Sequence, residues 1–226
     1  MLFPAGVNHV ADDVQADQAS ARDRATRPGC EIGKVQGLIA MNDPTRGEYA
    51  GQPWRGEVCA VFAAETAGVE MHAVTAAQLV AGVGMAGDRY ALGKGHYSHL
   101  WHPDRQLTLI AQEVIDDVAR AIGEPIDGVE LRRNVVTRGV PLNSLVEKYF
   151  AVGEAIVYGG RLNVPCRYLE RLIDKKVFEP LLGCSGLNCQ ILRGGTVRPG
   201  DVVRPLRPGE ENAIEVPVVL VGKDAG

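Results

Sequence analysis

The sequence lacks the features of a membrane-spanning or secreted protein. No uninterrupted apolar run is long enough to span a bilayer, and the apolar residues 1–7 have no positive lead-in and run directly into Asn8 and His9. We therefore expect no transmembrane helix, no secretory signal peptide and no membrane association. A long block of Lys and Arg with interleaved aromatic residues is also missing, and the formal net charge is -4. This composition argues against a nucleic-acid-binding protein.

The cysteines fit neither a disulfide framework nor a structural zinc site. Their number is odd and no two of them have the two-residue spacing of a zinc-binding pair: Cys30, Cys59, Cys166, Cys184 and Cys189. This usage is typical of a reducing compartment, so we expect a cytoplasmic protein. Cys184 and Cys189 are each either a small packing residue or a resolving thiol for Cys166.

Composition and pattern divide the chain into three parts. With 226 residues, 46% of them hydrophobic, the chain can bury a full core. Residues 1–32 have no sustained period, which predicts a flexible N-terminal extension. Residues 33–206 hold short strand-like runs separated by Gly, Pro and Asn, which predict a predominantly β domain, an antiparallel barrel or sandwich; the first runs are 34–41, 57–63 and 69–74. Residues 207–226 predict a C-terminal edge strand around Pro217 and a tail.

Two helices are expected among the strands. The first spans residues 111–122, where apolar residues at helical spacing end at Gly123. The second begins after Pro165, a residue suited to a first helical turn. Between them, strand-like runs broken at Gly159 and Gly160 predict consecutive hairpins at 149–152, 155–158 and 161–164.

Residues 132–139 combine a strand-like run with a local positive charge. Two valines favour a strand, and three arginines gather in a chain that is acidic overall. The guanidinium fork suits phosphate or carboxylate, and amide and hydroxyl groups add further hydrogen bonds. The segment therefore predicts an anion site made from Arg132, Arg133, Asn134, Thr137 and Arg138. A solvated strand edge with ordinary charges is the alternative.

Cys166 is the candidate nucleophile or metal ligand. It follows Pro165 at the expected start of the second helix, where unpaired backbone amides and the helix dipole favour a thiolate. A thiolate attacks electrophiles and binds soft metals. A cysteine that fills a small space in the core is the alternative, and the nearby arginines favour the active thiol.

Two further segments have a spacing that resembles a functional motif. Glycines at the dinucleotide-binding spacing occur at Gly82, Gly84 and Gly87. Because residues 89–93 are a poor helix start, we predict a tight turn that presents Asp88 and Arg89. Three histidines lie three residues apart at His96, His99 and His102. Gly95 before them and Pro103 after them favour an irregular loop at a pocket rim over a metal site.

Five segments, in their order along the chain, resemble the motifs of the MOSC family, the molybdenum cofactor sulfurase C-terminal domain, in its stand-alone bacterial form. They are GDRY at 87–90, RQLTLI at 105–110, RRNVVTRG at 132–139, PCRYLE at 165–170 and LRGGTVRPGD at 192–201. The resemblance covers residues 33–206. It implies a predominantly β fold, a closed pyruvate-kinase-like β-barrel with short peripheral helices.

The resemblance also implies a cofactor. Family members that carry the molybdenum cofactor use the matching cysteine as the protein ligand to molybdenum, which puts that role on Cys166. By the same matching, the pterin or its phosphate would be held by residues of the first and third motifs: Arg132, Asn134, Thr137, Arg138, Asp88 and Arg89. The sulfurase-like branch often has a second cysteine at the position of Leu169, so this chain departs from a two-thiol mechanism. Pyridoxal phosphate would belong to a partner protein, because the chain has no room for a desulfurase domain.

The sequence leaves three candidate functions, in order of preference. The first is a molybdenum-cofactor-dependent reductase of N-hydroxylated or related small molecules, supplied with electrons by an electron-transfer protein. The second is a sulfur-transfer module in which Cys166 carries a persulfide received from a cysteine desulfurase. The third is a non-catalytic anion-binding barrel. An oligomer is compatible with all three.

Overall fold

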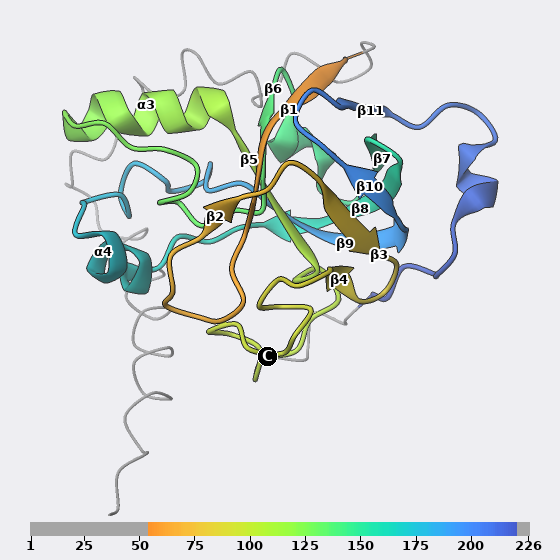
Figure 1. Ribbon diagram of the computed structural model, residues 1–226. Coiled ribbons are helices and arrows are strands. Elements are labelled where there is room, and N and C mark those ends of the chain that lie inside the picture. The colour runs from red at the N-terminus through yellow and green to blue at the C-terminus, as the bar shows by residue number, and fades with distance from the viewer. Residues whose placement is uncertain (1–53, 221–226) are drawn as a thin grey trace, which may run out of the picture.

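Seven strands form a closed barrel in the computed structural model, which describes residues 54–220 (Figure 1). Their order around the ring is β11-β7-β8-β9-β5-β6-β1, and β1 pairs with β11 to close it. The strands are β1 (Gly56–Ala63), β5 (Leu107–Ala111), β6 (Val135–Arg138), β7 (Tyr149–Val152), β8 (Ala155–Leu162), β9 (Leu187–Arg193) and β11 (Val202–Pro205). The predicted closed, predominantly β barrel is confirmed. The extension predicted at 1–32 and the strand predicted at 34–41 lie outside the described residues.

A helix connects the one parallel pair of strands in the ring. β5 and β6 pair in parallel, a geometry that needs a crossover, and α3 (Gln112–Ile122) supplies it. Val114, Ile115 and Val118 form its buried face, and Gly123 ends it in the left-handed conformation with φ 75°. The helix predicted at 111–122 is therefore confirmed. α3 lies at one end of β5 (Figure 1).

Shorter elements surround the barrel. β3 (Ala77–Val80) pairs with β4 (Gly84–Met85) and β10 (Gly195–Val197) in a separate small sheet. β2 (His72–Ala73) pairs with the end of β1 and is all that forms of the strand predicted at 69–74. The remaining elements are α4 (Arg167–Ile173) and the short 3₁₀ helices Leu142–Leu145 and Glu210–Ala213.

Apolar side chains from all seven barrel strands meet in one core. Leu107, Leu109, Phe150, Val157 and Leu187 have no measurable exposure. Fully burying a side chain of this size stabilises a fold by about 1.5–3 kcal/mol relative to leaving it exposed. This core fixes the barrel wall from which the polar residues of the candidate site project.

The break predicted at Gly159 and Gly160 is wrong, because β8 runs through both residues. A Cβ atom on Gly159 would lie 2.1 Å from the carbonyl oxygen of Leu145, and one on Gly160 would lie 2.5 Å from Cβ of Asp104. The pairing with β9 shifts register between Gly159 and Arg161. The glycines therefore admit close neighbours and a bulge rather than ending the strand.

The edge strand predicted around Pro217 is also wrong, since residues 214–220 contain no strand. Glu215 and Val216 donate backbone hydrogen bonds to the carbonyl of Leu192, at 2.8 and 3.1 Å. Beyond them, the Gln190 side chain donates to the Pro217 carbonyl and accepts from the Val219 amide, both at 3.0 Å. Hydrogen bonds from the Gln190 side chain thus take the place of backbone strand pairing beside Pro217, which has no N–H group to donate.

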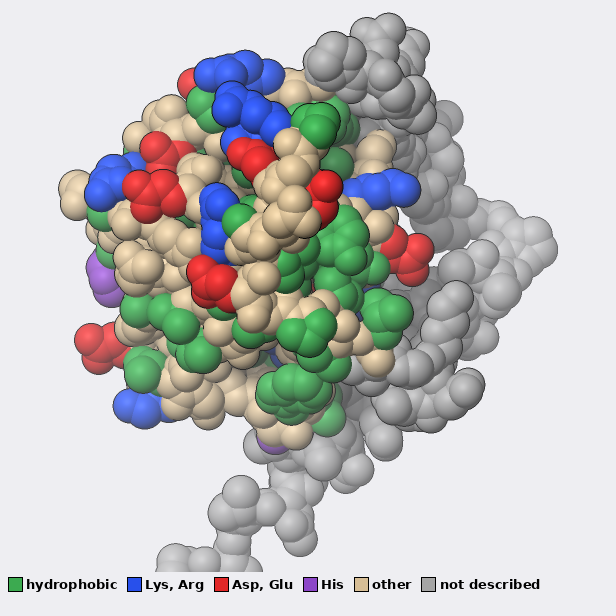
Figure 2. Space-filling model, turned by 90° about the vertical axis from the view of Figure 1, so that its right-hand side faces the viewer, with side chains coloured by type: hydrophobic (Ala, Val, Ile, Leu, Met, Phe, Trp, Pro, Cys, Tyr) green, Lys and Arg blue, Asp and Glu red, His purple; other side chains and the backbone are tan. Residues whose placement is uncertain are grey.

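The surface beside this segment is mixed in character. Figure 2 views the molecule from the right-hand side of Figure 1 and shows hydrophobic side chains gathered in the middle of the face, with scattered charged groups of both signs around them.

Within residues 54–220, no helix combines the length and the apolar character that crossing a membrane requires.

Candidate functional site

A cavity of about 670 Å³ opens beside the start of α4. Its volume is typical of a small-molecule site. The loop after β1, the loop between β4 and β5, the segment before β6, the end of β8 with the linker that follows it, and α4 line it, and Thr108 of β5 and Asn188 of β9 complete the lining. The lining includes five arginines, Arg89, Arg105, Arg132, Arg133 and Arg161, and among residues 54–220 no Asp, Glu or Lys lines it. The cavity therefore has an unbalanced positive wall that suits an anionic ligand.

Cys166 faces this cavity from the N-cap position of α4. It has extended backbone dihedrals, φ -134° and ψ 150°, and is half-buried. Pro165 before it and Leu169 one turn later also line the cavity. The sequence-based placement of Cys166 at a helix start is confirmed. A thiol that opens onto a cationic cavity can act as a soft metal ligand or as a nucleophile.

Arg133 lies buried beneath the cavity wall. Its Nε donates to the carbonyl of Ser185 at 2.9 Å and its Nη1 to the carbonyl of Leu131 at 2.8 Å. Its Nη2 donates to Oδ1 of Asn163 at 2.8 Å and to Oγ of Ser185 at 2.6 Å. All four acceptors are uncharged, and burial lowers the pKa of Arg133 to about 10, with Cys166 acting in the opposite direction. Arg133 is thus a rigidly held cation within electrostatic reach of the thiol.

Arg132 presents a second guanidinium with unused hydrogen-bonding capacity. Its backbone has φ 60°, a strained value for a residue with a side chain, and its Nη1 donates to the carbonyl of Val69 at 2.6 Å. Its Nη2 is buried without a partner among the described residues. Burial, followed by the positive charge of Arg89, lowers the pKa of Arg132. An anion in the cavity would satisfy the free donor and relieve this repulsion.

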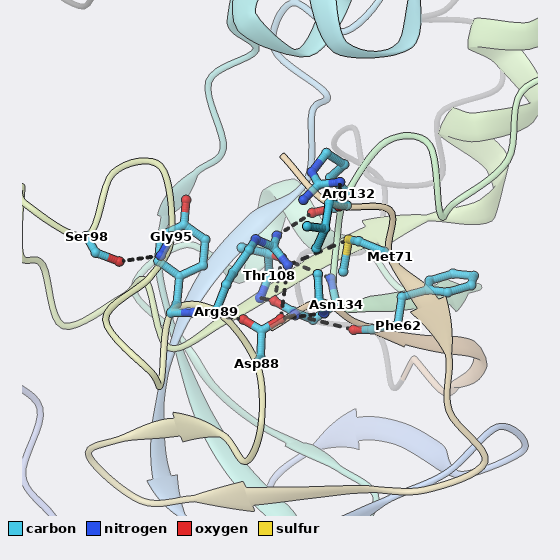
Figure 3. Close-up of polar contacts among 12 residues, drawn as sticks. Phe62, Met71, Asp88, Arg89, Gly95, Ser98, Thr108, Arg132 and Asn134 are labelled. Atoms are coloured by element: carbon cyan, nitrogen blue, oxygen red, sulfur yellow. Dashed lines mark hydrogen bonds and ion pairs between the residues drawn. The ribbon is translucent and has the colours of Figure 1, made fainter. Parts of the chain in front are cut away.

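Asp88 organises the base of the arginine wall (Figure 3). Its Oδ1 accepts from Nη1 of Arg89 at 3.0 Å and from Nδ2 of Asn134 at 3.1 Å, and its Oδ2 accepts from the Tyr90 amide at 3.1 Å. Arg89 in turn donates through Nη2 to the backbone carbonyl of Arg132 at 3.1 Å. Asp88 is almost fully buried and does not line the cavity, so it acts by orienting Arg89.

Besides Asp88, three of the sequence-predicted cofactor residues do not line the cavity. The side chain of Asn134 is buried, where its Oδ1 accepts from Oγ1 of Thr108 at 2.8 Å (Figure 3). Thr137 is fully buried and donates to the carbonyl of Ile110 at 3.4 Å. Arg138 is exposed at the end of β6. The structure therefore brings Cys166, Arg132 and Arg89 together and leaves these three in or outside the barrel wall.

An aromatic wall lies beside the arginines, and the sequence predicted only the part of it that belongs to the loop at the pocket rim. It consists of Tyr90, His96, Tyr97 and Tyr168. The rings of His96 and Tyr168 stack in parallel, with centroids 4.0 Å apart and planes 7° apart. This stack joins the loop between β4 and β5 to α4 across the cavity. The helical period of the residues after Pro165 could have placed Tyr168 near Cys166, but nothing local indicates its partner His96.

The predicted histidine loop is irregular, as expected, and contributes His96 to the cavity. His99 and His102 do not line it. Within residues 54–220, no group of three or more His, Cys, Asp or Glu side chains is arranged to hold a metal ion. Cys184 and Cys189 are buried, and burial raises the pKa of Cys189 well above its ordinary value. The packing role for these two cysteines fits their position better than a resolving thiol does.

Acidic pH is expected to loosen the stack of His96 on Tyr168. Burial, then His99 and Arg171, lower the pKa of His96 below its usual 6.5. The folded state binds this proton more weakly than the unfolded chain does. The contribution of neutral His96 to the free energy of unfolding is therefore complete above the pKa of the unfolded state, and it is lost as the pH falls through the lower pKa of the folded state. Lowering the pH from about 7 to about 5 should therefore lower the Tm of the wild type more than that of His96→Phe, which retains a stacking ring. Thermal unfolding at several pH values measures this difference. The exposed His72 gives a control, because His72→Phe should keep the wild-type dependence of Tm on pH. An equal change of Tm with pH in the wild type and in His96→Phe would contradict this expectation.

Comparison with known proteins identifies the family and the fold. The model of the MOSC domain matches residues 96–204. The crystal structure of the YuaD protein from Bacillus subtilis matches with a TM-score of 0.57 and 22% sequence identity, over 69% of this chain and 99% of that one. The crystal structure of YiiM from Geobacillus stearothermophilus matches with a TM-score of 0.53 and 13% identity, over 68% of this chain and 76% of that one. These two likenesses concern the fold. No curated protein matches the chain.

Proposed function

The chain is a MOSC domain protein, and from this we propose that it binds the molybdenum cofactor in the arginine-lined cavity and reduces N-hydroxylated or related small molecules. The proposal assigns Cys166 as the protein's ligand to molybdenum. The observation that carries it is that Cys166 lines the same cavity as five arginines.

The residues present fit this group on chemical grounds. The cofactor is anionic, through its phosphate and its dithiolene sulfurs, and the cavity lining carries positive charge without a carboxylate. The buried Nη2 of Arg132 has no described partner and would gain one from a phosphate oxygen. A thiolate is the soft ligand that suits a metal already bound by sulfur.

Each residue then has a separate task. Cys166 would hold the metal, and Arg132 and Arg133 would neutralise the anionic part of the cofactor. Arg89, oriented by Asp88, supports Arg132 through its backbone carbonyl. The aromatic wall would exclude water and present flat apolar surface to a substrate.

The reaction consumes electrons and protons that must come from elsewhere. Converting an N–OH group to N–H takes up two electrons and two protons and releases water. The cofactor, held by Cys166 and the arginines, would supply the oxygen-transfer and redox chemistry. An electron-transfer protein is the proposed source of the electrons.

A sulfur-transfer role is the second candidate, and it uses the same thiol. Among the described cysteines, Cys166 alone lines the cavity. Such a thiol could accept the outer sulfur of a desulfurase persulfide, which returns the desulfurase cysteine to its thiol, and within residues 54–220 no second cysteine lines the cavity to release that sulfur. In that case, mass spectrometry after incubation with a desulfurase and cysteine would show a persulfide on Cys166 in protein without metal.

Metal and pterin analysis of the freshly purified protein tests the first candidate. We expect molybdenum and pterin in matching amounts, and reduction of benzamidoxime to benzamidine when a chemical reductant replaces the electron-transfer protein. A molybdenum enzyme purified from the same cells shows that cofactor was available. Absence of both molybdenum and pterin beside a loaded control enzyme would refute cofactor binding.

A further inference from the structure

Arg105 and Arg161 form a pair of cavity cations that the proposed function leaves without a role. Arg105 lies two residues before β5, and Arg161 lies in β8. The buried Nε of Arg105 has no hydrogen-bond partner among the described residues, and its guanidinium carbon lies 5.4 Å from the centre of the Tyr97 ring. Arg161 is held through Nε, 3.2 Å from Oδ2 of Asp104, and its side chain is 42% exposed.

The charged neighbours of this pair differ from those of Arg132. Burial, followed by Arg161, lowers the pKa of Arg105, whereas Arg89 is the charged neighbour that lowers the pKa of Arg132. Tyr90 is near both groups, because it influences Arg105 and Arg132 alike. The cavity therefore holds two cationic regions with the Tyr90 ring adjoining each.

The acidic residue beside the pair neutralises it only in part, although it also raises the pKa of Arg105. Asp104 is buried outside the cavity lining and also contacts Nδ1 of His102 at 2.6 Å. One carboxylate is thus shared by His102 and Arg161, while Arg105 has no described carboxylate contact. Positive charge therefore remains at this part of the cavity lining, together with the unpartnered Nε of Arg105, an arrangement that a carboxylate or phosphate would complete.

We propose that Arg105 and Arg161 form a second anion subsite, which binds a carboxylate or phosphate group of the substrate. The substrate is then an anion whose reducible end reaches toward Cys166 while its charged end lies at Arg105 and Arg161. The aromatic faces of Tyr90 and Tyr97 suit a planar ring between the two ends. The assignment of this ligand as a substrate rests on the proposed reductase function, whereas the anion subsite itself does not.

Two probes that differ by one carboxylate test the subsite. They are benzamidoxime and 4-carboxybenzamidoxime. We expect the wild type to favour the carboxylated probe in kcat/KM. The Arg105→Gln substitution, which removes no described hydrogen bond, should lower the ratio of the two kcat/KM values by about 10-fold or more, the size expected for a hydrogen bond to a charged group. Arg161→Gln should lower it in the same direction. Arg198→Gln, at an exposed position outside the cavity, should keep the wild-type ratio.

A binding measurement on cofactor-free protein separates this inference from the proposed function. Isothermal titration calorimetry should show that 4-carboxybenzamidoxime binds the wild type more tightly than benzamidoxime does, and that Arg105→Gln loses this preference. If this binding preference is found but the purified protein contains no molybdenum, the reductase function is rejected and the anion subsite is supported. No preference for the carboxylated probe in the wild type would overturn the subsite. The subsite would also be overturned if Arg105→Gln lost molybdenum and pterin but kept the preference for the carboxylated probe, because the pair would then hold the phosphate of the cofactor.

Discussion

Cys166→Ser is expected to remove nearly all molybdenum from the purified protein. A serine hydroxyl remains protonated at neutral pH and is a hard oxygen donor, so it cannot replace a soft thiolate. Loss of residues that merely orient a metal ligand weakens metal binding by about 10- to 100-fold, and loss of the ligand itself should exceed that. Elemental analysis of wild type and variant, purified in parallel, measures the effect.

Cys59→Ser is the matched control for this experiment. Cys59 is half-buried on β1, outside the cavity lining, and burial raises the pKa of its thiol. We therefore expect Cys59→Ser to keep the wild-type metal content. Equal molybdenum in wild type and Cys166→Ser would contradict the ligand assignment, even if activity were lost.

Arg133→Leu is expected to destabilise the fold by about 3 kcal/mol or more, the range seen when one partner of a buried polar network is removed. The substitution leaves acceptors on Leu131, Asn163 and Ser185 without the donors that now satisfy them. Urea unfolding followed by circular dichroism measures the loss. Replacing the exposed Arg198 with leucine should change the free energy of unfolding by less than about 0.5 kcal/mol.

Phosphate provides a second readout for Arg133. Burial disfavours the charged form of this side chain, as its lowered pKa of about 10 indicates, and a bound anion offsets that effect. Phosphate should therefore raise the Tm of the wild type more than that of Arg133→Leu. An equal rise in both proteins would mean that phosphate acts elsewhere.

Local pattern was enough to predict the elements that depend on nearby residues. The helix at 112–122 has an apolar face and a terminating glycine, and both are visible in the sequence. The position of Cys166 at the start of α4 followed from Pro165 and the helical spacing after it. The barrel followed from the repeated short strands and from the family motifs.

Pairings between distant segments could not be predicted in the same way. Gly159 looked like a chain break because its close neighbour, the carbonyl of Leu145, is set by tertiary packing. Asn134 looked like a ligand residue, but Thr108 and Asp88 occupy its side chain inside the wall. Arg105, which precedes β5, and Arg161, which lies in β8, are neighbours because β5 and β8 both pair with β9, a relation that no local spacing encodes.

The seam between β1 and β11 bears on where the independently folding unit begins. Residues 96–204 match the family model, yet the ring is closed by β1, at Gly56–Ala63, which precedes that region. A fragment trimmed to the matched region would leave β6 and β11 with unpaired backbone groups, and such open edges invite strands from neighbouring molecules. A correctly folded, non-aggregating fragment therefore requires a boundary upstream of Gly56.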